Sequence, residues 1–395
     1  MRSFLTPRLA LLALAHFTID SYSSFLSPLL PLLVTKLDLS LTLVGALVAL
    51  SSVSSSFAQP LFGWLSDRLH RPWFVALGPL VAAVFLSAIG LAPTFQALVA
   101  LLMLGGMGVA AFHPQAAVLA GESPERRGLA MSFFITGGTL GFALGPLFAV
   151  AVVGAFGLER TWVALLPGVA ICVVLLAMFG RLHRQARERG PRPALRELRP
   201  VVRPLTLLYL VVVCRSAVSY GFMTFLPLRL HDHHFPVTVG GAVLTAYLGL
   251  GALGGFFGGW LADRWGGRRV VVRSFVGAIP LFFAFLVLPD VPGIVCLVVG
   301  SFILQGSLPV NVVLGQELSP RHSSTISSLL MGAAWGVGAL LIGPIGALAD
   351  HLGLAAALAC LTGLLVIGLF CAIGLPSPGH APRLVDPMAP GGVGE

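Results

Sequence analysis

Long, uninterrupted apolar stretches are the feature that most limits what this 395-residue chain can fold into. A helix needs about 20 mostly apolar residues to cross the hydrocarbon core of a bilayer. Twelve stretches of that size lie near residues 9–33, 43–66, 73–92, 95–118, 129–155, 161–180, 204–229, 238–262, 270–289, 292–315, 324–349 and 353–375. The sequence therefore predicts an all-α polytopic membrane protein with 12 transmembrane helices.

The composition excludes several other classes of protein. Charged residues make up only 10% of the chain, whereas a soluble domain carries about 25%. This excludes a soluble enzyme, a nucleic-acid-binding protein and a secreted disulfide scaffold. The five cysteines all lie in apolar stretches without a C-x-x-C pair, so we expect neither a disulfide framework nor a metal site.

The distribution of basic residues predicts the orientation in the membrane. Twenty Lys and Arg residues fall on one side of the predicted spans, and only Lys36, Arg160 and Arg229 fall on the other. Because basic loops stay in the cytoplasm, we expect a multi-pass protein of the inner membrane with both termini in the cytoplasm. The net charge of +9 is therefore a topology signal, and no nucleic-acid partner is expected.

The second half of the chain repeats landmarks of the first. GWLSDR at Gly63–Arg68 returns as GWLADR at Gly259–Arg264, and Gly145-Pro146 returns as Gly343-Pro344. A Ser-Pro pair and a proline inside a span also recur at nearly the same offset. Such landmarks indicate a duplicated six-helix unit. Parallel repeats around an axis along the membrane normal are typical of secondary transporters that bind substrate midway through the bilayer.

The repeat predicts the domain organisation. We expect a six-helix bundle over residues 1–180, a basic cytoplasmic linker over 181–203, a second bundle over 204–375 and a disordered cytoplasmic tail over 376–395. The linker is the only long polar segment inside the chain, and the tail is rich in Pro and Gly.

Two loop segments resemble the signature G-x-x-x-D-R-x-x-R-R of the major facilitator superfamily. They read GWLSDRLHRP from Gly63 to Pro72 and GWLADRWGGRR from Gly259 to Arg269. The resemblance implies a network that locks the cytoplasmic gate in the outward-facing state; the alternative is a pure topology device. The gating residues implied are Gly63, Asp67, Arg68, Arg71, Gly259, Asp263, Arg264, Arg268 and Arg269.

Ionisable residues near the middle of a span are costly and are functional candidates by default. His16 and Asp20 stand four residues apart, on one face of the first helix. Asp20 is the only acid deep in a span, so we expect it to carry a proton, assisted by His16 and by His113 in the fourth span. The alternative is that these side chains only satisfy one another or the nearby backbone.

Arg215 in the seventh span cannot deprotonate. It must pair with Asp20, with substrate, or with each in turn, and competition for it would couple substrate to protons. Other polar side chains could add hydrogen bonds to a ligand, although such residues also bind helices together. These candidates are Tyr22, Gln59, Tyr220, Tyr247, Gln305 and Asn311.

Several segments resemble the fosmidomycin-resistance efflux family. They are His16-x-x-x-Asp20, PLLPLL at Pro28–Leu33, Gln59-Pro60-Leu61, GGMGVAAFHPQAA at Gly105–Ala117 and GGTLGFALGP at Gly137–Pro146. The family commonly has an acid after His-Pro, where this chain has Gln115. The resemblance implies proton-driven efflux of a small drug-like molecule, and Arg215 would suit a phosphonate-like anion.

The antiporter signature of drug/proton exchangers is partly present. Gly141, Gly145 and Pro146 match it, whereas Ser132 and Ala149 stand where glycines are usual. We expect a monomeric, cofactor-free proton antiporter that exports a small drug-like or anionic molecule. The alternative with the same fold is proton-coupled uptake of an organic anion or other small metabolite.

Other function classes find little support. No nucleotide-binding loop of the Walker type occurs, so pumping driven by ATP is not expected. An enzyme would need a nucleophile and base, or metal ligands, grouped together, and no such set appears. The run His231-Asp232-His233-His234 has metal-ligand chemistry, but it follows the seventh span, where a solvated loop is favoured over a metal site.

Overall fold

The computed structural model describes residues 6–66, 72–120, 127–178, 195–319, 322, 326 and 329–376. All regular secondary structure in these residues is helical. Twelve segments are long and apolar enough to cross a membrane, as the sequence predicts. They are Pro7–Leu37, Leu41–Gly63, Trp73–Leu91, Phe95–Ala120, Phe133–Phe156, Leu158–Ala177, Arg196–Asp232, Val237–Trp265, Gly267–Val287, Asp290–Leu318, Leu329–Leu352 and Leu354–Ile373.

Spans one to six form the N-terminal half. Its α-helices are α1 (Pro7–Ser23), α2 (Leu26–Leu37), α3 (Leu41–Ser52), α4 (Gln59–Ser66), α5 (Trp73–Ser87), α6 (Phe95–Ala120), α7 (Arg127–Phe156) and α8 (Leu166–Ala177). A π-helical turn, η1 (Val53–Phe57), joins α3 to α4, and the 3₁₀ segments η2 (Ala88–Leu91) and η3 (Leu158–Leu165) complete spans three and six.

Spans seven to twelve form the C-terminal half. Its α-helices are α9 (Val202–Asp232), α10 (Val237–Trp265), α11 (Gly267–Val287), α12 (Asp290–Gln305), α13 (Leu308–Leu318), α15 (Ala334–Leu340), α16 (Ile342–Leu352) and α17 (Leu354–Ile373). A 3₁₀ helix, η5 (Leu195–Val201), leads into α9, and a π-helical turn, η7 (Leu329–Ala333), precedes α15.

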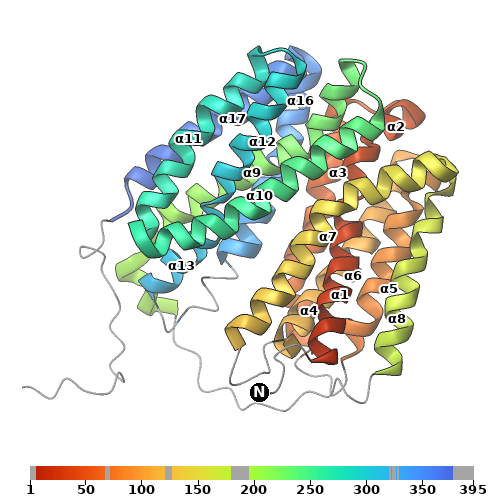
Figure 1. Cartoon of the computed structure of the whole chain (residues 1–395), viewed down its shortest axis with the longest axis horizontal. Helices are drawn as coiled ribbons and strands as arrows, with labels where there is room; N and C mark the ends of the chain where they lie inside the picture. Colours follow the sequence, from red (N-terminus) through yellow and green to blue (C-terminus); the bar gives the residue numbers. More distant parts are fainter. Residues whose placement is uncertain are drawn as a thin grey trace, which may run out of the picture.

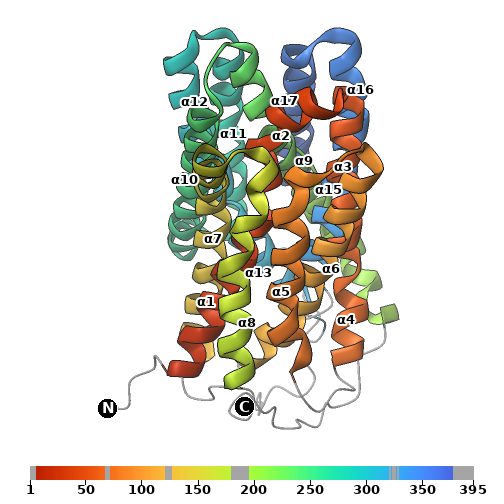
Figure 2. The ribbon, with the colours of Figure 1, turned by 90° about the vertical axis from the view of Figure 1, so that its right-hand side faces the viewer.

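The two halves lie side by side as separate bundles (Figure 1; Figure 2 gives the view turned by 90°). Helices α3 and α2 contact α15, α16 and α9 of the other half, and α7 contacts α10. We name the two ends of the molecule by their chain segments. The linker end is where α8 ends at Ala177 and η5 begins at Leu195, and the far end is where α2 gives way to α3.

The halves are joined most closely at the far end. The carboxylate of Asp350, near the end of α16, accepts hydrogen bonds of 2.8 Å from the backbone N–H groups of Leu41 and Thr42. It also accepts one of 2.5 Å from the Thr42 hydroxyl. The first N–H groups of a helix have no partner within it, so Asp350 caps α3 from the opposite half. Toward the linker end the two bundles diverge (Figure 1).

The seventh span differs from its predicted range of 204–229. It reaches from Arg196 to Asp232 because η5 continues directly into α9. Val201 is fully buried in a small cluster that also contains Leu318 and Leu375. Apolar packing therefore makes the last residues of the predicted linker helical. The rest of that linker, 181–194, and the tail from 377 lie outside the described residues.

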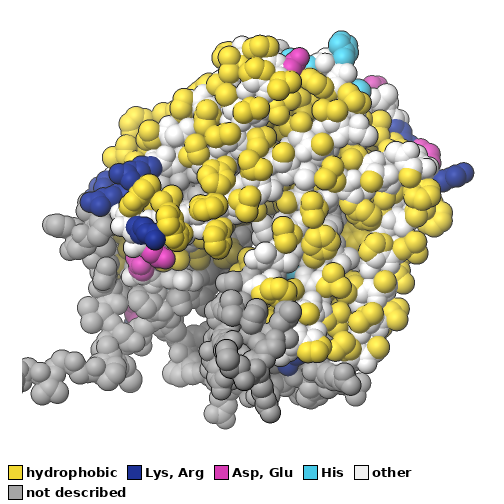
Figure 3. All heavy atoms as spheres, viewed as in Figure 1, with side chains coloured by type: hydrophobic (Ala, Val, Ile, Leu, Met, Phe, Trp, Pro, Cys, Tyr) yellow, Lys and Arg dark blue, Asp and Glu magenta, His cyan; other side chains and the backbone are white. Residues whose placement is uncertain are grey.

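The outer surface matches a protein surrounded by lipid. Figure 3 shows hydrophobic side chains spread over the sides of both bundles, with the charged side chains toward the ends. Large apolar side chains are well exposed on the sides, among them Phe256 at 74% and Phe370 at 70%. Exposed apolar surface of this extent is stable only against hydrocarbon.

Candidate functional site

The candidate proton site brings together two spans of the N-terminal half. His16 and Asp20 lie on α1, and His113 lies on α6. One oxygen of Asp20, Oδ2, is 3.2 Å from His16 Nε2, and the other, Oδ1, is 3.2 Å from His113 Nε2. Each carboxylate oxygen thus has its own imidazole partner. The Asp20 side chain is 17% exposed and that of His113 is 25% exposed, so water has limited access to the site.

Backbone carbonyls determine which imidazole nitrogen carries a hydrogen. His16 Nδ1 lies 2.9 Å from the carbonyl oxygen of Phe134, and His113 Nδ1 lies 2.8 Å from that of Val109. A carbonyl only accepts hydrogen bonds, so each Nδ1 is the donor. A neutral form of either imidazole then presents a lone pair at Nε2 toward Asp20.

The two contacts with Asp20 therefore need protons. A lone pair at 3.2 Å from a carboxylate oxygen is attracted only when a proton lies between the two atoms. With a proton in both contacts, two neutral imidazoles and one carboxylate carry a single net positive charge. Loss of one proton leaves two acceptors facing each other, so proton release should rearrange the site. Hydrogen bonds account for the whole arrangement, although its ligand atoms, within 4.8 Å of one another, would also suit a metal ion.

Glycines on α7 place α1 and its histidine. A Cβ at Gly138 would overlap the His16 ring, and one at Gly141 would overlap the backbone of Phe17. Gly145 likewise lies against the Ser21 backbone. The His16 ring stacks on Phe134, with ring centres 4.2 Å apart. The glycines of the antiporter signature therefore hold α1 close to α7 inside one half, as small residues do in membranes.

Arg215 on α9 lies apart from Asp20 and has other partners. Its Nη1 donates to Gln305 Oε1 at 2.7 Å, and its Cζ lies 5.1 Å from the ring centre of Trp335. The side chain is only 1% exposed, and its Nε has no hydrogen-bond partner among the residues that the structure describes. The expected pairing of Arg215 with Asp20 is not present in this conformation. A buried cation with a free donor is suited to an anionic group.

Some predicted ligand contacts have structural roles instead. The Tyr22 hydroxyl donates to Ala164 O at 2.5 Å and accepts from Gly168 N at 3.1 Å, so it ties α1 to the sixth span and is not free for a ligand. Tyr247 is 1% exposed, and its carbonyl accepts from Ser301 between α10 and α12. Gln59 donates to Ser55 within its own span.

Two other candidates lie in the same half as Arg215, and one of them, Tyr220, shares its aromatic partner. The ring of Tyr220 stands edge-on to Trp335, with centres 6.0 Å apart, and Trp335 also faces Arg215. Asn311 is 1% exposed, and within the described part of the chain neither its amide nitrogen nor its oxygen has a hydrogen-bond partner. Buried polar atoms without partners are rare, so Asn311 is the stronger of these two candidates for a ligand contact.

The motif glycines occupy equivalent places in the two halves. Gly63 faces Pro114 of α6, and Gly259 faces Pro309 of α13. Asp67, Arg68 and Arg71 lie outside the described residues. In the second copy, Asp263 is exposed and forms no ion pair with any residue that the structure describes. The locked network implied by the motif is therefore not formed there in this conformation.

The partners of Arg264, Arg268 and Arg269 are neutral. Arg264 lies over Trp260, Arg268 donates to the carbonyl of Ile373, and Arg269 reaches the carbonyl of Trp265.

Gln115 follows His-Pro, where an acid is common in the fosmidomycin-resistance family. It is 3% exposed, and its Oε1 accepts from the backbone N–H of Val75 at 3.2 Å, in the first turn of α5. The same N–H also lies 3.1 Å from the carbonyl oxygen of Pro72, so Gln115 supplies a second acceptor in the first turn of this helix. This position therefore serves helix capping.

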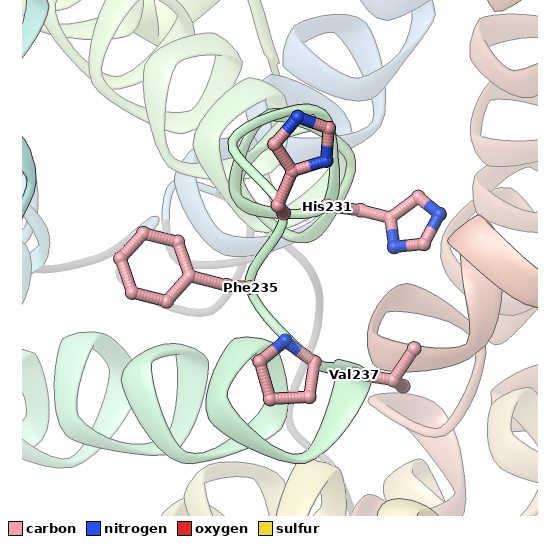
Figure 4. A pocket seen from close by; sticks show the side chains of 5 residues that line it. His231, Phe235 and Val237 are labelled. Atoms are coloured by element: carbon pink, nitrogen blue, oxygen red, sulfur yellow. The ribbon is translucent and has the colours of Figure 1, made fainter.

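The histidine-rich segment borders a pocket of about 400 Å³ (Figure 4). Its first two residues, His231 and Asp232, form the end of α9 and not, as predicted, a loop after the seventh span. In Figure 4, His231, Phe235 and Val237 project in different directions from the turn. His233 Nδ1 lies 3.0 Å from Asp290 Oδ1. Within the described ranges only His16, Asp20 and His113 bring three potential ligand atoms together, so this turn lacks the geometry of a metal site.

Comparisons with known proteins agree with this architecture. The family model of the Major Facilitator Superfamily matches residues 12–342. The chain belongs to the major facilitator superfamily. Its members are transporters and not enzymes, and the prediction from the two loop motifs is confirmed.

Individual relatives are similar over nearly the whole facilitator. An uncharacterized MFS-type transporter of Bacillus subtilis, YfnC, is 28% identical over 94% of this chain and 93% of its own. The fosmidomycin resistance protein of Escherichia coli is 28% identical over 87% of this chain and 86% of its own. A bacterial homolog of the human lysosomal transporter Spinster, solved in an inward-facing and unoccupied conformation, has the same fold, with a TM-score of 0.79 and 17% identity over 93% of this chain and 96% of that chain.

Sequence reasoning missed several contributors to the site. The carbonyls of Phe134 and Val109 orient the imidazoles, but a backbone acceptor leaves no trace in residue identity. Trp335, which faces Arg215 from a distant span, was not predicted either, whereas its other partner, Gln305, was among the predicted residues. Gly138 was visible within the GGTLG run, although only the fold shows that its missing side chain makes room for His16.

Proposed function

We propose that this facilitator is a proton antiporter that exports a small drug-like or anionic molecule. It lies in the inner membrane, with both termini on the cytoplasmic side. One observation carries the proposal: both oxygens of Asp20 face imidazole nitrogens that need shared protons. The similarity to a fosmidomycin resistance protein supports export. The facilitator acts as a monomer whose two halves rock against each other, so that the substrate site opens to one side of the membrane at a time.

Competition at Asp20 supplies the coupling in this proposal. A substrate hydroxyl or N–H that donates to a carboxylate oxygen of Asp20 replaces the proton held there, so substrate enters as a proton leaves. The anionic or polar part of the substrate binds Arg215 Nε and Asn311, which have unsatisfied donors or acceptors in the C-terminal half. In the absence of substrate, Gln305 accepts the hydrogen bond of Arg215 that an anion would otherwise accept.

The signature residues act in the conformational change. In the opposite conformation, Asp263 pairs with the arginines of its loop, and Asp67 does the same with Arg68 and Arg71. Gly63 and Gly259 allow the close helix contacts that such a state needs. Gly141 and Gly145 keep α1 and its proton site attached to α7 throughout, whereas Pro146 lies on the side of α7 that faces Gly241 of α10.

Transport in everted membrane vesicles with an acidic interior tests the proposal. Fosmidomycin and related anions are added, and the collapse of the pH gradient is followed for wild type, Asp20→Asn and Arg215→Gln. We expect a substrate-dependent loss of the gradient in wild type only. If the response persists in Asp20→Asn, another residue carries the proton. If no exported compound causes a response in wild type, the efflux proposal is refuted.

One observation favours uptake with protons as a second candidate. With a proton in each of the two Asp20 contacts, the site would carry a positive charge, which attracts an anion on Arg215 by Coulomb's law and favours loading both together. Proteoliposomes given an inward substrate gradient distinguish the two. Antiport makes the interior more alkaline as substrate enters, whereas coupled uptake acidifies it, and Asp20→Asn should abolish either change.

A further inference from the structure

Four arginines gather where α10 meets α11 at the linker end. Arg264, Arg268, Arg269 and Arg273 lie within ten residues that contain no acid, and Asp263 directly precedes them. Figure 3 shows Lys and Arg side chains clustered at this end of the C-terminal half. We refer to the four arginines as the α10–α11 basic cluster.

Two of the arginines lie on exposed indole rings. The Cζ of Arg264 is 3.5 Å from the ring centre of Trp260, and that of Arg273 is 4.6 Å from the ring centre of Trp265. Both tryptophans face outward, with exposures of 50% and 41%. A guanidinium that stacks on a ring keeps the N–H donors along its edge free for other partners.

The remaining two arginines also have only neutral partners. Arg268 Nη2 donates to the carbonyl of Ile373 at 2.6 Å, and Arg269 Nη1 lies 3.5 Å from the carbonyl of Trp265. Asp263 forms no ion pair with them among the described residues. Stacking and carbonyl contacts orient these cations without neutralising them, so the α10–α11 basic cluster keeps an excess of positive charge.

The cluster stands at the boundary between hydrocarbon and headgroups. The eighth span ends at Trp265, and the ninth begins at Gly267. One turn before Trp260, Phe256 and Phe257 are 74% and 47% exposed, which places a continuous apolar surface directly next to the arginines. Tryptophans typically mark the interface of a membrane, and arginines nearby reach into the headgroup layer.

We propose that the α10–α11 basic cluster binds the phosphate headgroup of an anionic phospholipid from the leaflet at the linker end. The edge N–H groups of Arg264 and Arg273 hold the phosphate oxygens, for which the planar guanidinium fork is well matched. The acyl chains lie along Trp260 and Phe256. This apolar surface, which a free phosphate would not use, is the reason to assign a lipid.

Tryptophan quenching by brominated lipids tests the proposal directly. The protein is reconstituted in phosphatidylcholine vesicles that contain phosphatidylglycerol, with bromine on the acyl chains of one lipid at a time. We expect brominated phosphatidylglycerol to quench several-fold more than its mole fraction predicts. Trp260→Phe and Trp265→Phe should remove most of this excess, which assigns it to the cluster.

Charge variants decide whether the arginines cause the preference. Each basic residue near an anionic surface contributes roughly a fivefold gain in binding, so Arg264→Gln with Arg273→Gln should remove most of the several-fold preference for phosphatidylglycerol. Arg229 is the matched control, because it also lies over an aromatic ring, Phe285, but at the far end. Arg229→Gln should leave the preference unchanged.

Two quenching results would overturn the proposal. One is equal quenching by both brominated lipids in the wild-type protein. The other is a preference that survives in the double variant while its circular dichroism spectrum remains native. Saturation by inorganic phosphate in place of lipid would also contradict it. None of these measurements involves transport, so the lipid-binding proposal is tested independently of the proposed function.

Discussion

At the scale of single residues, the position of the His16 ring depends on the absence of a side chain at Gly138. Gly138 leaves the space that the imidazole ring occupies, and Phe134 stacks on its other side. The Nδ1 hydrogen then has only the Phe134 carbonyl to bond. The close approach of α1 to α7 therefore determines that His16 Nε2 points toward Asp20, and this orientation determines which protons Asp20 can share.

Gly138→Ala should disturb the proton site without changing its chemistry. The added methyl group would overlap the His16 ring, and overpacking of this kind costs about 1–3 kcal/mol. We expect a lower unfolding temperature and a weaker substrate-dependent proton response. Gly154→Ala is the control on the same helix, since nothing lies within 4 Å of a Cβ there. Equal behaviour of the two variants would contradict this account of α7.

Arg215→Lys should weaken substrate binding although the charge is kept. A lysine cannot lie flat on Trp335 as the guanidinium does, and it has no counterpart of the Nε–H group that the substrate anion binds in the proposal. Losing one hydrogen bond to a charged group costs about 1.5–3 kcal/mol, so the substrate concentration for half-maximal response should rise at least about tenfold. Arg229→Lys, at the far end, serves as control. An unchanged half-maximal concentration in Arg215→Lys would remove this residue from the substrate site.

At the scale of elements, the two contact seams between the halves differ in construction. The seam of α7 with α10 consists of two uninterrupted helices. In the other seam, the π-helical turns η1 and η7 break the second and eleventh spans and contact each other. Such turns often mark functional positions in helices. We therefore expect bending to concentrate in the seam with the π-helical turns.

Asp350→Ala should loosen the far end of that seam. It removes the acceptor for two backbone N–H groups and the Thr42 hydroxyl, and a lost helix cap costs about 0.5–2 kcal/mol. Spin labels at Leu91 and Val291, exposed on opposite halves at this end, should report a larger population of long distances. Asp350→Asn, which keeps one acceptor oxygen, should fall between wild type and alanine.

Asp38→Asn is the control for that experiment. Asp38 ends α2 at the same end with a φ of 50°, a conformation that asparagine also tolerates. The distance distribution between the two spin labels in Asp38→Asn should match that of the wild type. If Asp350→Ala matched it as well, the cap would have no part in holding the halves together.

At the scale of the whole molecule, alternating access requires the far end to open. The contacts of Asp350 with Leu41 and Thr42 join the first half to the second at that end. The same contacts must break when the halves rock, because helices α3 and α16 belong to different bundles. Their energy is therefore part of the conformational equilibrium on which substrate and protons act.

A disulfide across that contact should stop transport reversibly. Thr42→Cys and Asp350→Cys place thiols on side chains that touch in this conformation, on a background without the five native cysteines. Oxidation should abolish transport, and reduction should restore it. Each single-cysteine variant should be insensitive to oxidant. Continued transport by the oxidised, cross-linked protein would mean that the halves move without opening there.

Much of the fold was predictable because a bilayer imposes strong physical limits. Backbone groups must be satisfied within each span, so twelve apolar stretches predict twelve helices, and the structure has them. The spacing of His16 and Asp20 predicts their contact by helical geometry alone. The extension of the seventh span back to Arg196 was not predictable, because it depends on the burial of Val201 among residues far away in sequence.

The sequence by itself determined the number of spans, the repeat and the family, since these depend on local hydrophobicity and on motifs in adjacent residues. Only the tertiary structure decided the partners of each buried polar group. It joined Asp20 to His113, separated Arg215 from Asp20, and turned Tyr22 toward the sixth span. The physical reason is that a polar atom in a span bonds the nearest acceptor or donor, and the packing of helices remote in sequence determines which one is near.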